Sequence, residues 1–413
     1  MERTKPDSRG PAPFGPPVAD AGLPVLPELA SRVAAAAGDV RAQPAGGNAE
    51  LLGAASEYWR RRSLPTGAAQ VVAAPGAQPL LLALLAAVGG EVLLTRPCAP
   101  WYPSQARLLG LPAYHAPAPA ECGGVPDPFA FLETVRRVRA EGGDPRVLVM
   151  AVVDDPTGTF APPELMHEVC EAAVDEGLLI ISDETYRDTL HGERPGREGV
   201  PVGLLSPAEM QPDHVVVLAD LGADLVPAAW PAAVARFPRT SRGAELHAAT
   251  LDALSTLHAV LPSPVAAAVA HALTEPQALT ERRFEAARLH GELAAALHRI
   301  VTGAGAFCRP PRAGGHLYPD LEPLRPALDA RGITDSVDLE DRLTAGLGVP
   351  VPGGHRFGDA PDLLRVRLST GPLLGADDEQ RLEVLVADDP LTVPHVADFL
   401  QRFAAWFDEP AGK

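Results

Sequence analysis

The chain has 413 residues, more than one typical domain, and its 46% hydrophobic content suits a folded protein with a large core. Its net charge of −18 argues against binding to nucleic acid or to an anionic membrane. The four cysteines are scattered without a CxxC pair, which indicates neither a zinc site nor a disulfide framework, so we expect a cytoplasmic protein without a bound metal.

The predicted elements alternate between helix and strand. Residues 1–21 are rich in proline, glycine and charge and lack the apolar stretch of a secretory signal, so we predict a disordered lead there. Later apolar runs are expected to be buried strands, namely Val71–Ala74, Glu91–Leu94, Val147–Val153, Leu178–Ser182 and Val215–Ala219. The apolar stretch Pro79–Gly89 is too short to cross a bilayer and predicts a buried helix. A long helix over Leu279–Leu297 is predicted to lead into a second domain.

The stretch from Val149 to Tyr186 is the most informative part of the chain. A first apolar run ends in the turn Asp155-Pro156-Thr157-Gly158, an amphipathic stretch follows, and a second apolar run ends in Asp183-Glu184-Thr185-Tyr186. This order of patterns predicts a βαβ unit with polar side chains where each strand ends.

Other short motifs follow the same order along the chain. They are Pro75-Gly76-Ala77-Gln78, Arg96-Pro97-Cys98-Ala99-Pro100, Gly314-Gly315-His316-Leu317-Tyr318 and Arg365-Val366-Arg367-Leu368-Ser369. Together with the βαβ unit they resemble the class I/II aminotransferases, the pyridoxal-phosphate (PLP) enzymes of fold type I. The resemblance implies an α/β fold with a mostly parallel mixed sheet between helices in a large domain, a smaller α/β domain, and a homodimer.

The domain boundaries follow from the same resemblance. We expect the large domain to span residues 51–275. The smaller domain is expected to combine residues 22–50 with residues 276–413.

The catalytic lysine of that family has no counterpart here. In the family it follows the strand after the Asp-x-x-Tyr motif and forms a Schiff base with PLP, whereas this chain has lysine only at Lys5 and Lys413. When the chain is matched to the family, Asp220 and Gly222 stand at the positions of the two phosphate-binding serines. Ala223 stands at the position of the lysine and Pro231 at that of the phosphate-binding arginine.

The predicted phosphate site is therefore poor. Gly76-Ala77-Gln78 remains as a vestigial phosphate turn, but Asp220 and Asp224 add negative charge beside it. Two like charges about 4 Å apart repel by roughly 4 kcal/mol at an effective dielectric constant near 20. Ala99 stands where the family has an aromatic residue that stacks on the cofactor ring. We expect no bound cofactor, or PLP held only non-covalently.

Three positions still match the family's site. Asp183 matches the carboxylate that pairs with the pyridine nitrogen, Tyr186 the tyrosine beside the ring oxygen, and Arg367 the arginine that binds a substrate carboxylate. Asp155 replaces an asparagine that donates to the ring hydroxyl.

These residues predict a site for a ligand with a carboxylate and an amine. Asp183, Tyr186 and Asp155 are the candidate catalytic residues. Asp183 is a candidate general acid or base, because a buried carboxylate without its pyridinium partner has a raised pKa. The candidate substrate-binding residues are Arg367, Asp220, Asp224, Tyr102 and His316. For Asp220 and Asp224, a position on a solvated loop is an equally good interpretation.

Three functions stay open on the sequence. The first is a PLP-independent enzyme that performs acid–base chemistry on a small metabolite bearing a carboxylate and an amine, which by analogy belongs to specialised (natural-product) biosynthesis. The second is a catalytically inactive homologue that binds a partner enzyme or a metabolite. The third is an aminotransferase-like enzyme that holds PLP or its amine form non-covalently.

Overall fold

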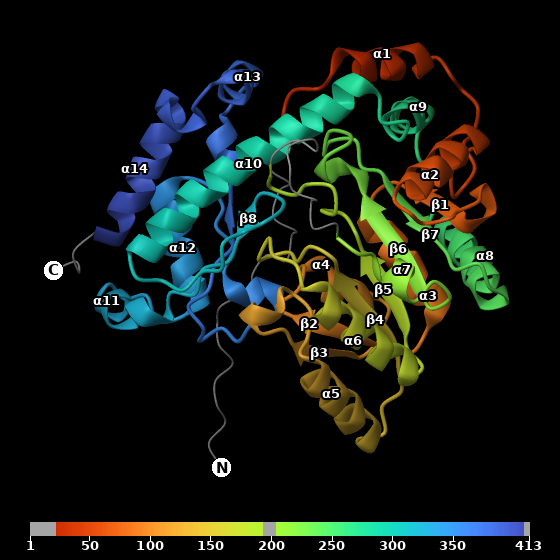
Figure 1. Ribbon diagram of the computed structural model, residues 1–413, viewed down its shortest axis with the longest axis horizontal. Helices are drawn as coiled ribbons and strands as arrows, with labels where there is room; N and C mark the ends of the chain where they lie inside the picture. The colour runs from red at the N-terminus through yellow and green to blue at the C-terminus, as the bar shows by residue number, and fades with distance from the viewer. Residues whose placement is uncertain (1–21, 193–203, 409–413) are drawn as a thin grey trace.

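The computed structural model describes residues 22–192 and 204–408 (Figure 1). The lead predicted over residues 1–21 lies outside these ranges. Helices surround a central sheet in one domain, and a second domain lies beside it (Figure 1). This arrangement confirms the predicted α/β fold class.

A seven-stranded mixed sheet forms the centre of the large domain, in the order β1-β7-β6-β5-β4-β2-β3. The strands are β1 (Val71–Ala74), β2 (Glu91–Arg96), β3 (Ala113–Pro117), β4 (Pro145–Ala151), β5 (Leu179–Asp183), β6 (Val215–Asp220) and β7 (Ala233–Arg236). Only β7 runs antiparallel to its two neighbours, and the other pairs are parallel. The predicted strands are all present. β3 and β7 were not predicted, because neither contains a long apolar run.

Two apolar cores cover the two faces of this sheet. One face packs on helices that include α2 (Ala49–Arg61), α5 (Pro128–Ala140), α6 (Pro163–Asp175) and α9 (Ser263–Ala272). The other packs on α3 (Ala77–Val88), α4 (Trp101–Leu108) and α8 (Ser241–Thr256). A sheet buried on both faces explains why its central strands are continuous apolar runs rather than alternating patterns.

The smaller domain has its own core and is joined to the large one by α10 (Gln277–Gly303), a long helix that runs between them in Figure 1. Its other elements are α11 (Arg325–Ala330), α12 (Ser336–Leu347), α13 (Asp378–Val386), α14 (Pro394–Asp408) and the short hairpin of β8 (His316–Leu317) with β9 (Leu368–Ser369). None of the described helices is long and apolar enough to span a membrane.

The amino-terminal segment divides between the two domains, which corrects the predicted boundary. Leu29 of α1 (Pro27–Ala36) is buried in the large-domain core, and Gly46 bridges to Ala73 of β1. Only Leu23 packs against the core of the smaller domain. The apolar side of α1 is covered by α9, so most of residues 22–50 belongs with the large domain rather than the smaller one.

The site lies where the central parallel strands end. β4, β5 and β6 are neighbours, so their carboxyl ends meet at one edge of the sheet. In open α/β sheets, ligands bind beyond this edge. Asp183 is the last residue of β5 and Asp220 the last of β6.

Candidate functional site

A cavity of about 300 Å³ lies between the sheet edge and the smaller domain. Asp155 lines it from the loop after β4, Ala223 from the short 3-10 helix η3 (Leu221–Ala223), and His290 from α10. Both domains contribute, because His316 and Arg367 of the smaller domain complete the wall. The size suits a small-molecule ligand.

An ion pair within the chain occupies one side of the cavity. Arg367 Nη1 lies 2.9 Å from Asp155 Oδ1, and the two side chains are only 11% and 13% exposed. Burial acts to raise the pKa of Asp155, but the Arg367 guanidinium outweighs burial and lowers that pKa overall. Arg367, which is predicted to bind the carboxylate of a substrate, is therefore paired with a carboxylate of the chain itself. No local pattern predicts this pairing, because the two residues are 212 positions apart.

Tyr186 and His316 also line the cavity, with their rings in an edge-to-face contact at 5.7 Å between centroids. Burial lowers the pKa of His316 to about 3, with the Arg367 guanidinium acting in the same direction. The imidazole is therefore neutral at physiological pH. Burial likewise raises the pKa of Tyr186 well above its usual value, so its hydroxyl keeps its proton.

His290 was not identified from the sequence. Its Nδ1 lies 2.6 Å from Thr370 Oγ1, which is also in the smaller domain, and burial lowers its pKa to about 4. No sequence signal marks this residue, since it lies in none of the motifs that resemble the family's site.

Asp183 is held by the chain rather than facing the cavity. The Tyr102 hydroxyl donates to Asp183 Oδ2 at 2.6 Å, and the Thr185 amide donates to Oδ1 at 2.9 Å. Burial raises the pKa of Asp183, and these hydrogen bonds act against that increase. Tyr102 is 2% exposed and does not line the cavity, so its predicted contact with substrate is wrong for this conformation.

Asp220 occupies the predicted phosphate turn. Its Oδ2 accepts a hydrogen bond of 3.0 Å from the Ala77 amide, and its Oδ1 accepts one of 2.8 Å from the Gly222 amide. Ala77 is the first residue of α3, and the first amides of a helix bind anions well. A carboxylate of the protein therefore accepts a hydrogen bond from an amide that the resemblance assigns to phosphate binding.

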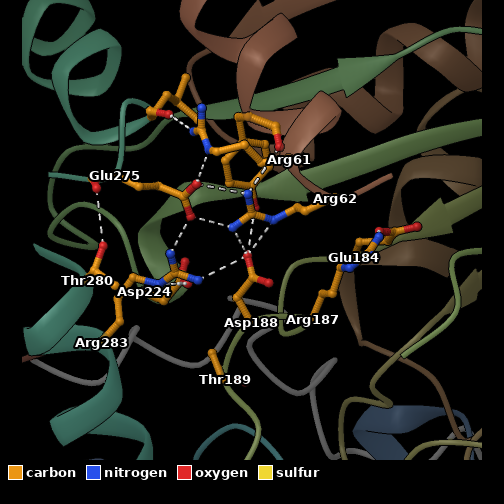
Figure 2. Close-up of polar contacts among 12 residues, drawn as sticks. Arg61, Arg62, Glu184, Arg187, Asp188, Thr189, Asp224, Glu275, Thr280 and Arg283 are labelled. Atoms are coloured by element: carbon orange, nitrogen blue, oxygen red, sulfur yellow. Dashed lines mark hydrogen bonds and ion pairs between the residues drawn. The ribbon is translucent and has the colours of Figure 1, made fainter. Parts of the chain in front are cut away.

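Asp224 belongs to a cluster of ion pairs beside the cavity (Figure 2). Its Oδ2 lies 2.9 Å from Arg283 Nε of α10. Arg283 also contacts Asp188 at 3.1 Å and Glu275 at 2.7 Å, and Arg62 of α2 pairs with the same two carboxylates. The cluster thus joins α2, the loop after β5, the loop after β6 and the start of α10.

The structure separates the four acidic residues and corrects the interpretation of Asp220 and Asp224 as residues of a solvated loop. Asp155 and Asp224 line the cavity, whereas Asp183 and Asp220 lie behind its wall, so the four do not form one acidic pocket. Asp220 and Asp224 are also not on a solvated loop, since one is bound by amides and the other by an arginine. Burial raises the pKa of Asp224 to about 6, and Arg283 acts against that increase.

The residues at the predicted cofactor position fit covalently bound PLP poorly. Ala223 offers no amine, Asp220 takes a phosphate amide, and the buried Ala99 offers no ring for stacking. Lys5 and Lys413 both lie outside the described residues. Within residues 22–192 and 204–408, no group of three histidine, cysteine, aspartate or glutamate side chains could hold a metal ion.

Comparisons with known proteins agree with this fold. A model of the family "Aminotransferase class I and II" matches residues 20–373. The aspartate/prephenate aminotransferase of Thermus thermophilus is 27% identical over 334 residues, which is 78% of each chain. The aspartate aminotransferase of Streptomyces avermitilis is 24% identical over 84% of this chain and 82% of its own length. A probable aspartate/prephenate aminotransferase of Thermus aquaticus is 30% identical over only 46% of each chain.

Solved structures show the same architecture. The aspartate aminotransferase from Thermus thermophilus with maleate superposes with a TM-score of 0.75 and 22% identity, over 94% of this chain and 90% of that chain. An aromatic aminotransferase from Pyrococcus horikoshii also gives 0.75, at 15% identity, over 95% and 94% of the two chains. At these identities the likeness concerns the fold.

Proposed function

Since the chain belongs to the aminotransferase class I and II family, we propose that it is an enzyme of that fold which works without covalently bound PLP. Its substrate is a small metabolite that bears a carboxylate and an amine, and its chemistry is acid–base. Ala223 at the lysine position, next to Asp220 on the phosphate turn, is the observation on which this proposal rests. The setting in specialised metabolism, the cytoplasmic location and the homodimer stay predictions.

The Asp155–Arg367 pair supports the substrate class. Its two charges are complementary to those of an amino acid, because Arg367 can bind a carboxylate and Asp155 an ammonium group. A zwitterion that inserts between them replaces one buried ion pair by two, so neither side chain is left with an unpaired charge. A ligand with only a carboxylate would separate Arg367 from Asp155 and offer Asp155 no cation in return. A ligand with only an ammonium group would offer Arg367 no anion.

Three groups on the cavity wall are placed to move protons. Asp155 is ionised and His316 is neutral, so each has a lone pair that can accept a proton, and the Tyr186 hydroxyl can donate one. Asp183 supports the site from behind through Tyr102, so its share of proton transfer is proposed only after a rearrangement that exposes it. The identity of the reaction is left open among condensation, cyclisation, dehydration and isomerisation.

Substrate binding is tested by calorimetry with L-alanine, propionate and ethylamine on the full chain. We expect the zwitterion to bind more tightly than either fragment, and Arg367→Gln and Asp155→Asn each to weaken it by at least about tenfold. Asp154→Asn is the matched control, because this neighbouring carboxylate does not line the cavity. Equal binding of propionate and L-alanine would contradict the proposed role of Asp155.

Ordinary transamination is the competing function, and the names of the relatives favour it. It needs an amine that forms an imine with PLP, and the side chains of Lys5 and Lys413 are the only lysine amines in the chain. An absorbance spectrum after gel filtration with added PLP decides between the two. A violet cofactor band in the wild-type chain that disappears in Lys5→Arg/Lys413→Arg would overturn the PLP-independent proposal.

An inactive homologue and an enzyme with loosely held PLP are the remaining alternatives. Replacing Arg367 separates enzyme from partner protein, because an enzyme loses turnover whereas a scaffold preserves the flux of its pathway. Loosely held PLP would give a band that is present at equilibrium and lost on gel filtration.

A further inference from the structure

A second cavity, of about 470 Å³, lies beside the turn that follows β4. It shares no lining residue with the cavity described above. The two adjacent acids Asp154 and Asp155 face different cavities, since Asp154 lines the second and Asp155 the first. Nothing in the proposed function uses this second space.

Asp154 is the buried polar group of the second cavity. It is 3% exposed, and its Oδ2 accepts hydrogen bonds from the Thr157 hydroxyl at 2.6 Å and the Thr157 amide at 3.2 Å. Its Oδ1 has no hydrogen-bond donor among residues 22–192 and 204–408. The close approach of Gly124 permits this position, because a Cβ there would lie 2.2 Å from the Asp154 Cβ. One carboxylate oxygen is thus left for a ligand.

The other lining residues favour an apolar ligand body. Pro97, Ala118, Pro119 and Phe307 contribute apolar surface. The inner cation, Arg365, is already paired with Asp320 at 2.9 Å and Asp359 at 3.1 Å. Arg309 is exposed at the rim, where water and salt screen its charge.

We propose that the second cavity binds an apolar primary amine, whose ammonium group donates to Asp154 Oδ1 and whose hydrocarbon body packs against the proline and phenylalanine side chains. The volume lies within the range of small-molecule sites. A buried carboxylate with a free oxygen is stabilised by a cation, and an anion would be repelled by it. The proposal is independent of whether PLP binds to the first cavity.

The expected pH dependence agrees with this geometry. Burial raises the pKa of Asp154 to about 7, against the hydrogen bonds from Thr157, and the charges of Asp155 and Asp359 add to the increase. An alkyl ammonium group has a pKa near 10 and stays charged from pH 6 to pH 8. Amine binding should therefore be stronger at pH 8, where the carboxylate is ionised, than at pH 6, where it must first lose a proton.

The test uses phenethylamine as the probe, with phenethyl alcohol and 3-phenylpropionate as neutral and anionic analogues, in calorimetry on the full chain. We expect the amine to bind at least about tenfold more tightly than either analogue at pH 8, and Asp154→Asn to remove that preference. Asp155→Asn is the matched control, since Asp155 lines only the first cavity and loss of its charge acts on Asp154 in the direction opposite to a loss of amine binding. This variant should bind L-alanine more weakly and should bind phenethylamine as tightly as the wild-type chain does at pH 8.

A second variant keeps the test valid if Asp154→Asn does not fold. Ala120 is exposed on the rim of the second cavity, and Ala120→Trp should fill the space and abolish amine binding without removing a buried charge. Equal binding of the amine and the alcohol would overturn the proposal. So would amine binding that is lost in Asp155→Asn and kept in both Asp154→Asn and Ala120→Trp, because the amine would then occupy the first cavity.

Discussion

Three carboxylates at the carboxyl edge of the sheet receive their donors from the chain itself. The pairs are Asp155 with Arg367, Asp183 with Tyr102, and Asp220 with the Ala77 amide. A buried carboxylate without a donor is costly, so each position that a ligand would otherwise neutralise needs a protein partner. Each of these three carboxylates therefore has a donor within the chain.

Tyr102→Phe tests how much one of these donors, the Tyr102 hydroxyl, stabilises the fold. The change removes the 2.6 Å hydrogen bond to Asp183 and leaves a buried carboxylate with one donor fewer. We expect the free energy of unfolding at pH 7.5 to fall by about 1–3 kcal/mol. The measurement is urea unfolding of both proteins.

The pH dependence of that loss has a definite sign. Burial already raises the pKa of Asp183, and removing the Tyr102 donor raises it further, so the variant is penalised when the carboxylate is ionised. The loss should shrink as the pH falls and the carboxyl group becomes protonated. Tyr114→Phe is the control for a less buried hydroxyl, because the Tyr114 hydroxyl of β3 lies near the carboxylate of Glu91, and it should lower stability less than Tyr102→Phe does. A loss independent of pH would point to lost packing instead.

At the scale of an element, α3 is a helix whose amino terminus is bound by Asp220 rather than by a ligand. Asp220→Ala should lower the free energy of unfolding by about 1 kcal/mol, as the loss of a helix cap does. It should also expose the α3 amides as an anion site, so that inorganic phosphate raises the melting temperature of the variant more than that of the wild-type chain.

Asp127→Ala is the matched control for that experiment. Asp127 caps α5 by accepting from the Phe129 and Ala130 amides, so the variant should lose similar stability. Its first helical residue, Pro128, has no amide proton, and phosphate should therefore restore little. Equal recovery in both variants would show that phosphate acts non-specifically.

The ion cluster links four parts of the chain, and Glu275, just before α10, is one of its carboxylates with a lowered pKa. Burial acts to raise the pKa of Glu275, but the hydrogen bonds from Arg62 and Arg61 and the charges of Arg62 and Arg283 lower it to about 2. The stabilisation is therefore complete above the unfolded pKa near 4.5 and is lost as the pH falls towards 2.

Glu275→Gln should lower the free energy of unfolding at pH 7 by about 2 kcal/mol, because it removes the charge that faces three arginines. The difference from the wild-type chain should narrow between pH 4.5 and 2. Glu57→Gln is the control, because Glu57 forms an exposed pair with Arg60 on α2, and its effect should stay below about 0.5 kcal/mol. Urea unfolding across this pH range measures both, and a constant difference would contradict the electrostatic explanation.

Helices and strands were largely predictable from the sequence, because the pattern of apolar residues that indicates each of them is local. The five predicted apolar runs are strands in the structure. The helix predicted over Leu279–Leu297 is α10, although α10 begins before and ends after these bounds. Partners of side chains were not predictable. Tyr102 and Asp183 are 81 positions apart and Asp155 and Arg367 are 212 apart, and no local pattern encodes such a contact.

At the scale of the whole molecule, the positions predicted to depart from the family pattern include Asp220 and Ala223 near the carboxyl edge of the sheet, while each domain has its own buried apolar core. The buried apolar clusters on the two sheet faces and in the smaller domain are continuous. At one of these positions, Asp220 accepts a hydrogen bond from the Ala77 amide. The scaffold is therefore expected to accept the family's cofactor again once those positions are restored.

Ala223→Lys combined with Asp220→Ser and Pro231→Arg tests this expectation. The lysine supplies an amine for imine formation, and the serine and arginine supply donors for the phosphate in place of a carboxylate. We expect this triple variant to keep a violet PLP band through gel filtration. Ala223→Lys alone should keep little of it, because Asp220 still occupies the Ala77 amide.

The two terminal lysines provide the control for this gain of function. Lys5→Arg/Lys413→Arg in the triple variant should leave the band unchanged, because the amine at residue 223 is the one that reacts. If the single variant holds PLP as firmly as the triple variant, the Asp220 carboxylate does not obstruct phosphate. In that case the missing lysine alone separates this chain from its relatives, and the internal pairing at Ala77 has no part in excluding the cofactor.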